Sequence, residues 1–149
     1  NNNGRLPIED EIDVISVGTS FLRFLQIGEK IKKEISVVTD NDGDVEALRS
    51  KYDGYLGEKA KPGIRICFDD VIDGGDLTDG KKPYNYNTLE PKLLKANNRA
   101  ILNKIFETDK QTDEELQLYM IKHKTECALQ IFKANETISF PQYILDAIG

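Results

Sequence analysis

The chain has 149 residues, of which 39% are hydrophobic and 31% are charged, so it suits a folded domain with a hydrophobic core and not a disordered protein. The formal net charge of −6 usually argues against nucleic-acid binding, and no apolar run approaches the ~20 residues of a membrane-spanning helix. Cys67 and Cys127 lack the spacing of a zinc site. We therefore expect two ordinary thiols in a reducing compartment, which indicates a cytoplasmic protein.

The first half of the chain predicts a βαβ unit. Residues 12–17 read as a strand ended by Gly18, residues 21–33 have helical apolar spacing behind a cap at Thr19 or Ser20, and residues 35–38 read as a buried strand. A helix over 45–52, capped by Asp42 or Asp44, and a strand over 64–68 follow. Because crossovers of this kind join parallel strands, Gly18 and the residues after 38 are expected at one edge of the sheet.

The second half of the chain is predicted to be mainly helical. Residues 69–86 are rich in turn residues and predict a loop or an irregular hairpin. Residues 87–106 predict a helix with an apolar stripe, and residues 112–132 predict another, opened by a capping box at Thr112. A short helix is expected at residues 141–148, with Pro141 in its first turn. The fold class predicted from these patterns is α/β.

Three acids follow the buried strand at alternate positions, namely Asp40, Asp42 and Asp44. Open α/β sheets bind ligands at the carboxyl ends of their strands. In an extended segment, residues two apart point to the same side, so Asp40 and Asp42 can converge. Converging carboxylates repel one another unless a cation lies between them, and Mg²⁺ prefers oxygen ligands. A solvated acidic turn is the alternative, because Asp, Asn and Gly are turn residues.

Two other enzymatic or binding interpretations of this segment are weaker. A calcium-binding EF-hand loop needs Gly and Glu where this chain has Val45 and Lys51, so that interpretation fails. An aspartyl phosphatase of the HAD-like type would use Asp40 as its nucleophile, but such enzymes usually have Thr or Val where Asp44 stands. A domain that only binds or scaffolds, with acids that cap and solvate, is the non-enzymatic alternative.

Later segments supply further candidates, each with a structural alternative. Glu90 stands three residues after Asn87, which is the spacing of a capping box. Lys122 and Lys124 lie on a polar helix face and are solvated charges by default. The single histidine, His123, is expected to be exposed and without a chemical role.

The order of these segments resembles the Toprim region of the OLD-family (overcoming lysogenization defect) nucleases, which carry an ATPase domain ahead of it. The resemblance covers nearly the whole chain and rests on five segments, which are Val14–Gly18, Val37–Asp44, Asn87–Glu90, Lys124–Leu129 and Phe140-Pro141. It implies a Toprim-like parallel sheet within residues 1–80 and a helical portion, residues 81–149, that completes the active site. It also implies a Mg²⁺- or Mn²⁺-dependent DNA endonuclease or nickase that hydrolyses phosphodiester bonds with two metal ions.

The resemblance assigns roles to particular residues. Asp40, Asp42 and Glu90 match the metal ligands, and Lys124 matches the lysine that faces the cleaved phosphate. Lys122 takes that role if the register differs.

The implied partners are DNA and the protein's own N-terminal ATPase domain, which would hold ATP, while a homodimer is left open. The basic run from Lys81 to Lys104 is expected to contact the DNA backbone. One feature departs from the family: Toprim regions begin with a strand that carries a glutamate, and neither Glu9 nor Glu11 fits that pattern. We therefore expect that the chain starts after that strand and that its metal site is incomplete.

Overall fold

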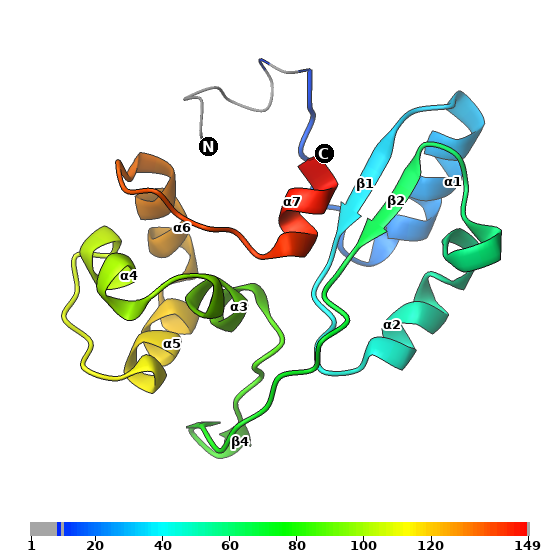
Figure 1. Ribbon diagram of the computed structural model, residues 1–149. Helices are drawn as coiled ribbons and strands as arrows, with labels where there is room; N and C mark the ends of the chain where they lie inside the picture. The colour runs from blue at the N-terminus through cyan, green and yellow to red at the C-terminus, as the bar shows by residue number, and fades with distance from the viewer. Residues whose placement is uncertain (1–8, 10, 149) are drawn as a thin grey trace.

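The computed structural model describes residue 9 and residues 11–148. The fold is mixed α/β, with a two-stranded parallel sheet and a two-stranded antiparallel pair (Figure 1). The strands are β1 (Ile35–Val38), β2 (Ile64–Cys67), β3 (Thr78–Asp79) and β4 (Lys82–Pro83). The helices are α1 (Phe21–Ile31), α2 (Val45–Lys51), α3 (Leu89–Ala96), α4 (Arg99–Ile105), α5 (Asp113–Lys122), α6 (Lys124–Lys133) and α7 (Gln142–Ile148), and 3₁₀ turns lie at Gly18–Ser20, Asp53–Tyr55 and Gly57–Lys59.

The predicted strands at 35–38 and 64–68 are confirmed and pair in parallel, with Ile35 opposite Ile64 and Val38 opposite Cys67. Helix α2 lies between them in sequence. Helix α1 packs against the sheet through a hydrophobic cluster whose buried members are Phe21, Leu25, Leu48, Tyr52, Tyr55 and Ile64. A Cβ added at Gly28 would lie 2.0 Å from Cδ1 of Ile35, so α1 packs closely on β1 here and a larger residue would force the Ile35 side chain to move.

The strand predicted at residues 12–17 does not form, so the expected βαβ unit around α1 is wrong. Within the described ranges the parallel sheet contains only β1 and β2, and residues 12–17 have no strand partner. Val14 is 82% exposed. Alternating apolar residues indicate a tendency to be buried, but a strand also needs a neighbouring backbone to bond. Ser20, one of the two predicted caps, is the N-cap residue of α1, but its side chain makes no capping bond.

Each of the two long helices predicted in the second half is divided. Asn97 and Asn98 separate α3 from α4, because Asn98 caps α4 by accepting a bond from the Ile101 N–H at 2.9 Å. His123 separates α5 from α6. Thr112 caps α5 as predicted, accepting from the Glu115 N–H at 3.2 Å. The helices enclose a second hydrophobic cluster of Leu93, Leu94, Leu102, Ile105, Phe106, Leu116, Met120 and Cys127.

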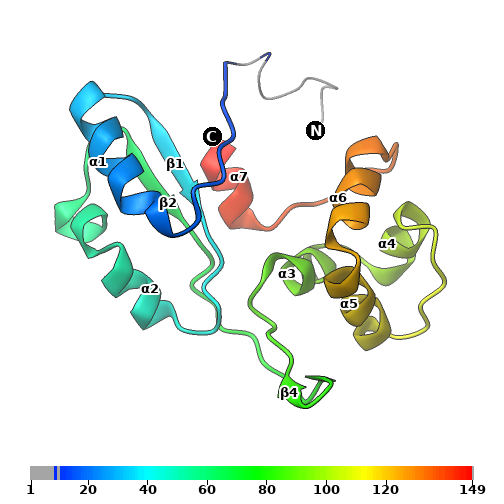
Figure 2. The same cartoon turned by 180° about the vertical axis from the view of Figure 1, so that it is seen from behind.

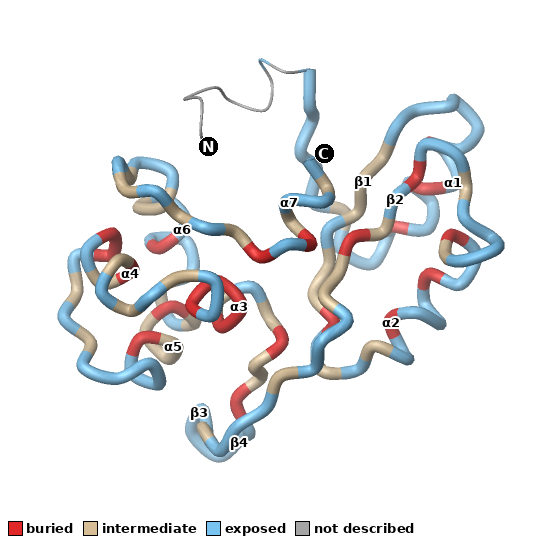
Figure 3. Tube along the Cα trace, viewed as in Figure 1, coloured by how far each residue is buried: buried red, intermediate tan, exposed pale blue. Residues whose placement is uncertain are grey.

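The last helix, α7, lies between the parallel strands and the helices α3 to α6, and the two opposite views agree on this (Figures 1 and 2). Buried residues gather on each side of it, under α1 and among α3 to α5 (Figure 3). The predicted helix at 141–148 and the predicted hairpin within 69–86 are confirmed by α7 and by the β3–β4 pair. The division at residue 80 stays a prediction. In the part of the chain that the structure describes, no helix is long and apolar enough to cross a membrane.

Candidate functional site

Asp40 lies just after β1 and contacts two distant parts of the chain. The phenol hydroxyl of Tyr143, which is buried in α7, donates to Oδ1 of Asp40 at 3.1 Å. The backbone N–H of Leu89, the first residue of α3, lies close enough to this carboxylate to lower its pKa. Asp40 is therefore the point where β1, α3 and α7 meet.

The surroundings of Asp40 disfavour its negative charge. Burial raises the pKa of Asp40, and the negative charges of Asp42 and Glu90 raise it further, while the hydrogen bond from Tyr143 and the nearby backbone N–H of Leu89 oppose the rise. Burial likewise raises the pKa of Tyr143, and the charge of Asp40 adds to this, so the phenol remains a donor at neutral pH. Such a carboxylate is stabilised when a cation binds beside it.

The segment between the two predicted ligands is a turn and not the extended chain that the alternation assumed. Asp42 has a φ of 51° and Gly43 a φ of 85°, so both adopt left-handed conformations. The buried side chain of Asn41 accepts from the Gly43 N–H at 2.8 Å and donates to the carbonyls of Asp69 and Val71 at 2.6 and 3.1 Å. Asn41 thus ties this turn to the segment after β2. Asp42 is exposed but remains close enough to raise the pKa of Asp40.

The carboxylates of Asp44 and Asp42 each accept a hydrogen bond from another part of the chain. Asp44 caps α2 by accepting from the Ala47 N–H at 2.8 Å, as one of the predicted caps. Oδ1 of Asp42 accepts from the side chain of Asn85 at 3.4 Å. The carboxylate of Asp44 is therefore committed to helix α2, which leaves Asp40 and Asp42 as the candidate ligands of this segment.

Glu90 does not form the capping box that its spacing with Asn87 suggested. The N-cap of α3 is Thr88, whose hydroxyl donates to Oε2 of Glu90 at 2.9 Å, and Lys124 pairs with Oε1 at 2.8 Å. The Asn87 side chain instead bonds the backbone of Asp73. Burial alone would raise the pKa of Glu90, but the hydrogen bond from Lys124, with help from Thr88, lowers it below its ordinary value.

Lys124 and Lys122 occupy different positions. Lys124 is the first residue of α6, and its ammonium reaches Glu90 from an exposed stem. Lys122 is the last residue of α5 and pairs with no acid among residues 9 and 11–148. Of the two lysines that the sequence left open, the geometry places Lys124 next to a candidate ligand. His123 is paired with Glu126 and stacked on Tyr119.

Much of the predicted basic run is engaged with acids of the chain itself. Lys92 is only 4% exposed, and its ammonium contacts Asp69 at 2.7 Å, Asp73 at 2.6 Å and the Val71 carbonyl at 2.8 Å. Lys95, Arg99 and Lys104 pair with Asp73, Asp113 and Glu136. Four members of the run are therefore paired with acids of the chain itself, and the expected contact of the run with the DNA backbone stays a prediction. The Lys92 contacts instead join the segment after β2 to α3, which carries Glu90.

A buried polar group without a partner lies near Glu90. The Tyr84 hydroxyl makes no hydrogen bond with any residue in the described ranges, although the side chain is buried. Burial raises the pKa of Tyr84, and the nearby charges of Glu90, Tyr86 and Asp79 raise it further. An unsatisfied buried hydroxyl is unfavourable by about 1–3 kcal/mol, so a bound polar atom at this position would be stabilising.

The chemistry of the donor set fits a hard divalent cation. Among residues 9 and 11–148, no three His, Cys, Asp or Glu side chains are placed so that they could hold one metal ion together. Mg²⁺ in proteins is usually held by one or two carboxylates, and waters and substrate phosphates complete its shell. The partly buried Asp40, with Asp42 beside it, meets that smaller requirement.

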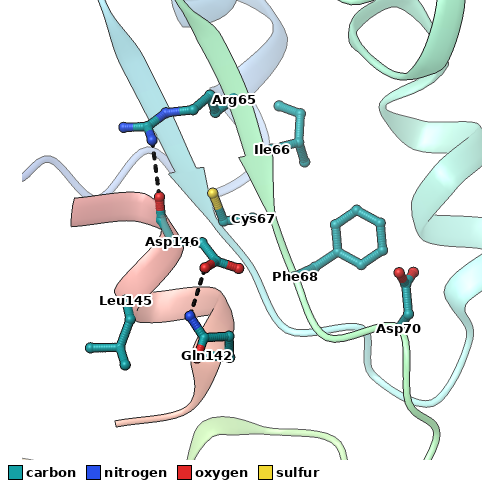
Figure 4. A pocket seen from close by; sticks show the side chains of 8 residues that line it. All are labelled: Arg65, Ile66, Cys67, Phe68, Asp70, Gln142, Leu145 and Asp146. Carbon is teal, nitrogen blue, oxygen red and sulfur yellow. Dashed lines mark hydrogen bonds between the residues drawn. The ribbon is translucent and has the colours of Figure 1, made fainter. Parts of the chain in front are cut away.

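A separate hollow of about 690 Å³ opens between β2 and α7 (Figure 4). Its walls are Arg65, Ile66, Cys67, Phe68, Asp70, Gln142, Leu145 and Asp146. The Arg65 guanidinium donates to the carbonyls of Asp146 and Ala147 at 3.1 and 3.4 Å, and Gln142 donates to the Asp146 carboxylate at 2.8 Å. A cation at the carbonyl end of a helix is stabilising, so these contacts fix α7 against β2.

Sequence reasoning missed Tyr143, Asn41, Lys92 and Tyr84 as parts of the site. Asn41 carried a usable signal, because it stands between two acids in a turn that needs an anchor. Lys92 looked like any other member of a basic run. Tyr143 looked like an ordinary apolar position of a short helix, and its role depends on where α7 docks.

Comparisons with known protein families, with curated proteins and with solved structures found no match for this chain.

Proposed function

We propose that the chain is the catalytic region of a metal-dependent DNA endonuclease or nickase of the OLD family, with a Toprim-like core. The observation that carries this proposal is the proximity of four residues from three segments: the negative charges of Asp42 and Glu90 act on Asp40, and Lys124 pairs with Glu90 at 2.8 Å. The resemblance assigns these same four residues to one site. Geometry and resemblance therefore point in the same direction.

In this proposal Asp40 and Asp42 provide the carboxylate oxygens for Mg²⁺ or Mn²⁺. An ion bound there would activate a water molecule and neutralise charge on the phosphate. Burial and two neighbouring acids disfavour the negative charge of Asp40, which supports a cation as the partner of this carboxylate. A two-metal reaction needs more carboxylates than this pair, and Glu90, whose charge acts on Asp40, is the further candidate.

Glu90 and Lys124 form the second half of the proposed site. The Glu90 side chain is 14% exposed and fixed by Thr88, whereas the Lys124 side chain is 59% exposed. The Lys124 ammonium can therefore turn from Glu90 to a phosphate oxygen without rearranging the helix that carries it. A lysine held beside the reacting phosphate stabilises the extra negative charge of the transition state.

DNA contact in this proposal is limited to part of the basic run. Lys81 and Lys82 are exposed at the β3–β4 hairpin, whereas Lys92 is buried in ion pairs. We infer that the hairpin lysines contact the DNA backbone and that the contact carries little sequence information.

The test combines ion binding with cleavage. Electron paramagnetic resonance of free Mn²⁺ measures binding to the chain, and plasmid nicking is measured with the full-length natural protein that carries it. Asp40→Asn is expected to abolish both, because it removes a charged ligand with little change in shape. Asp53→Asn is the matched control, since Asp53 pairs with Lys59 on the surface, and it should leave both unchanged. Binding and nicking by Asp40→Asn at the level of the unmodified protein would refute the proposal.

The same proteins separate the two alternatives. An aspartyl phosphatase would form a stable acyl-phosphate mimic at Asp40 with beryllium fluoride and would hydrolyse phosphomonoesters. A scaffold would show no effect of divalent ions on its melting temperature.

A further inference from the structure

Tyr143 lies outside the predicted set and contacts Asp40, a proposed ligand, directly. Its hydroxyl donates to Oδ1 of Asp40 at 3.1 Å, across 103 residues of sequence. The side chain is buried, so water does not readily replace this bond. No other side-chain donor to the Asp40 carboxylate is recorded among residues 9 and 11–148.

The position of Tyr143 is set by the docking of α7. The helix lies beside β1 and β2 (Figures 1 and 2). Its carboxyl end is held by Arg65, which donates to two of its carbonyls (Figure 4). Arg65 belongs to β2, the strand that pairs with the one leading to Asp40. The sheet therefore orients both the carboxylate and the helix that carries its donor.

A carboxylate that serves a metal ion must present an oxygen in a fixed direction. With Oδ1 bonded to the phenol, rotation about the Asp40 side chain is restricted, and Oδ2 is left for an ion. Partners of this kind behind a ligand typically change metal affinity or activity 10–100-fold when they are removed. The bond also makes the ligand geometry depend on α7, the last helix of the chain.

We propose that Tyr143 is a positioning residue that orients Asp40 for divalent-ion binding, and that the docking of α7 on the sheet thereby controls the affinity of the site. This inference rests on the proposed function, because it requires Asp40 to be a ligand. It adds a residue to which the resemblance assigns no role.

The test compares Mn²⁺ affinities by electron paramagnetic resonance. Tyr143→Phe keeps the ring and removes only the donor, and it is expected to weaken binding about tenfold or more. Tyr55→Phe is the matched control, because Tyr55 is a buried tyrosine of the α1–β2 cluster, and its affinity should not change. Circular dichroism of all variants reports whether the fold is retained.

A second variant weakens the Tyr143–Asp40 hydrogen bond indirectly, by loosening helix α7. Arg65→Met releases the end of α7 without altering Asp40 or Tyr143, and it should also weaken Mn²⁺ binding. If Tyr143→Phe does not fold, Arg65→Met decides the matter. Affinity at the level of the unmodified chain in the folded variant overturns the inference.

The outcomes for Tyr143 and for the proposed function are distinguishable. Loss of Mn²⁺ binding in Asp40→Asn with unchanged binding in Tyr143→Phe overturns the Tyr143 inference alone. A chain that binds no Mn²⁺ at all overturns the proposed function, and the positioning role with it. Weakened binding in Tyr143→Phe, with intact binding in Tyr55→Phe, supports both.

Discussion

Lys92 joins α3 to the segment after β2, so we expect its replacement by methionine to destabilise the fold strongly. Methionine keeps most of the volume and apolar length of the lysine. What is lost is a 4% exposed ammonium with carboxylate contacts at 2.7 and 2.6 Å and a carbonyl contact at 2.8 Å. The variant removes the cation that pairs with Asp69 and Asp73 and that donates to the Val71 carbonyl.

The magnitude follows from the burial of the partners. Breaking a fully buried ion pair costs about 3–5 kcal/mol. Here Asp69 and Asp73 are 27% and 25% exposed, and Lys95 still pairs with Asp73, so water and the second lysine recover part of the loss. We therefore expect Lys92→Met to lower the free energy of unfolding by about 2–3 kcal/mol.

Urea unfolding followed by circular dichroism measures this loss. With a slope of about 2 kcal/mol/M, the midpoint should fall by about 1–1.5 M at an unchanged slope. Lys95→Met is the matched control: its side chain is 59% exposed and shares the Asp73 partner, so its loss should be below about 1 kcal/mol. Equal midpoints for the two variants would show that burial of Lys92 does not stabilise the fold.

Three further predictions follow from the same contacts. Burial alone would raise the pKa of Asp73, but the hydrogen bonds from its lysine partners lower it below its ordinary value of 3.8. The ion pairs of Asp73 therefore stabilise the fold fully above that pH, and this stabilisation is lost as the pH falls through the lowered pKa. The stability difference between the unmodified chain and Lys92→Met should accordingly shrink below about pH 4, and a constant difference in urea titrations from pH 5 to 2.5 would contradict this. Tyr84→Phe should leave the free energy of unfolding unchanged or raise it by up to about 1–3 kcal/mol, because it removes an unpaired buried hydroxyl; a loss above about 1 kcal/mol in urea unfolding would reveal a partner. In the full-length natural protein, Lys124→Met should slow Mn²⁺-dependent nicking about 100-fold or more and Lys122→Met should not, and the reverse order in a plasmid assay would move the role to Lys122.

The local elements with strong patterns could be predicted from the sequence. These elements depend only on residues that are close in sequence. They are the β-branched strand at 35–38, the alternating strand predicted at 64–68, and the caps at Asp44 and Thr112. The strand expected at 12–17 failed because pairing depends on a distant backbone. The two helix breaks were not predicted, because the apolar stripe continues across them. Asn98 caps α4, but His123 makes no side-chain capping bond.

The candidate site shows the same limit. Asp40, Asp42, Glu90 and Lys124 could be named because the segments that carry them resemble a family, but periodicity alone would have made Glu90 a capping residue. The premise that Asp40 and Asp42 share one side of an extended chain was wrong, since Asp42 lies in a turn with a φ of 51°. The contribution of Tyr143 requires knowledge of how α7 docks, which no local pattern contains.

The most direct measurement is the location of the ion on the chain. In ¹H–¹⁵N spectra, small additions of Mn²⁺ should first broaden the amide signals of Asn41, Leu89 and Tyr143, which surround Asp40, and leave those of Asp53 and Lys59 sharp. Broadening that begins at Asp53 and Lys59, or the same pattern of broadening in Asp40→Asn, would contradict a divalent-ion site at the end of β1.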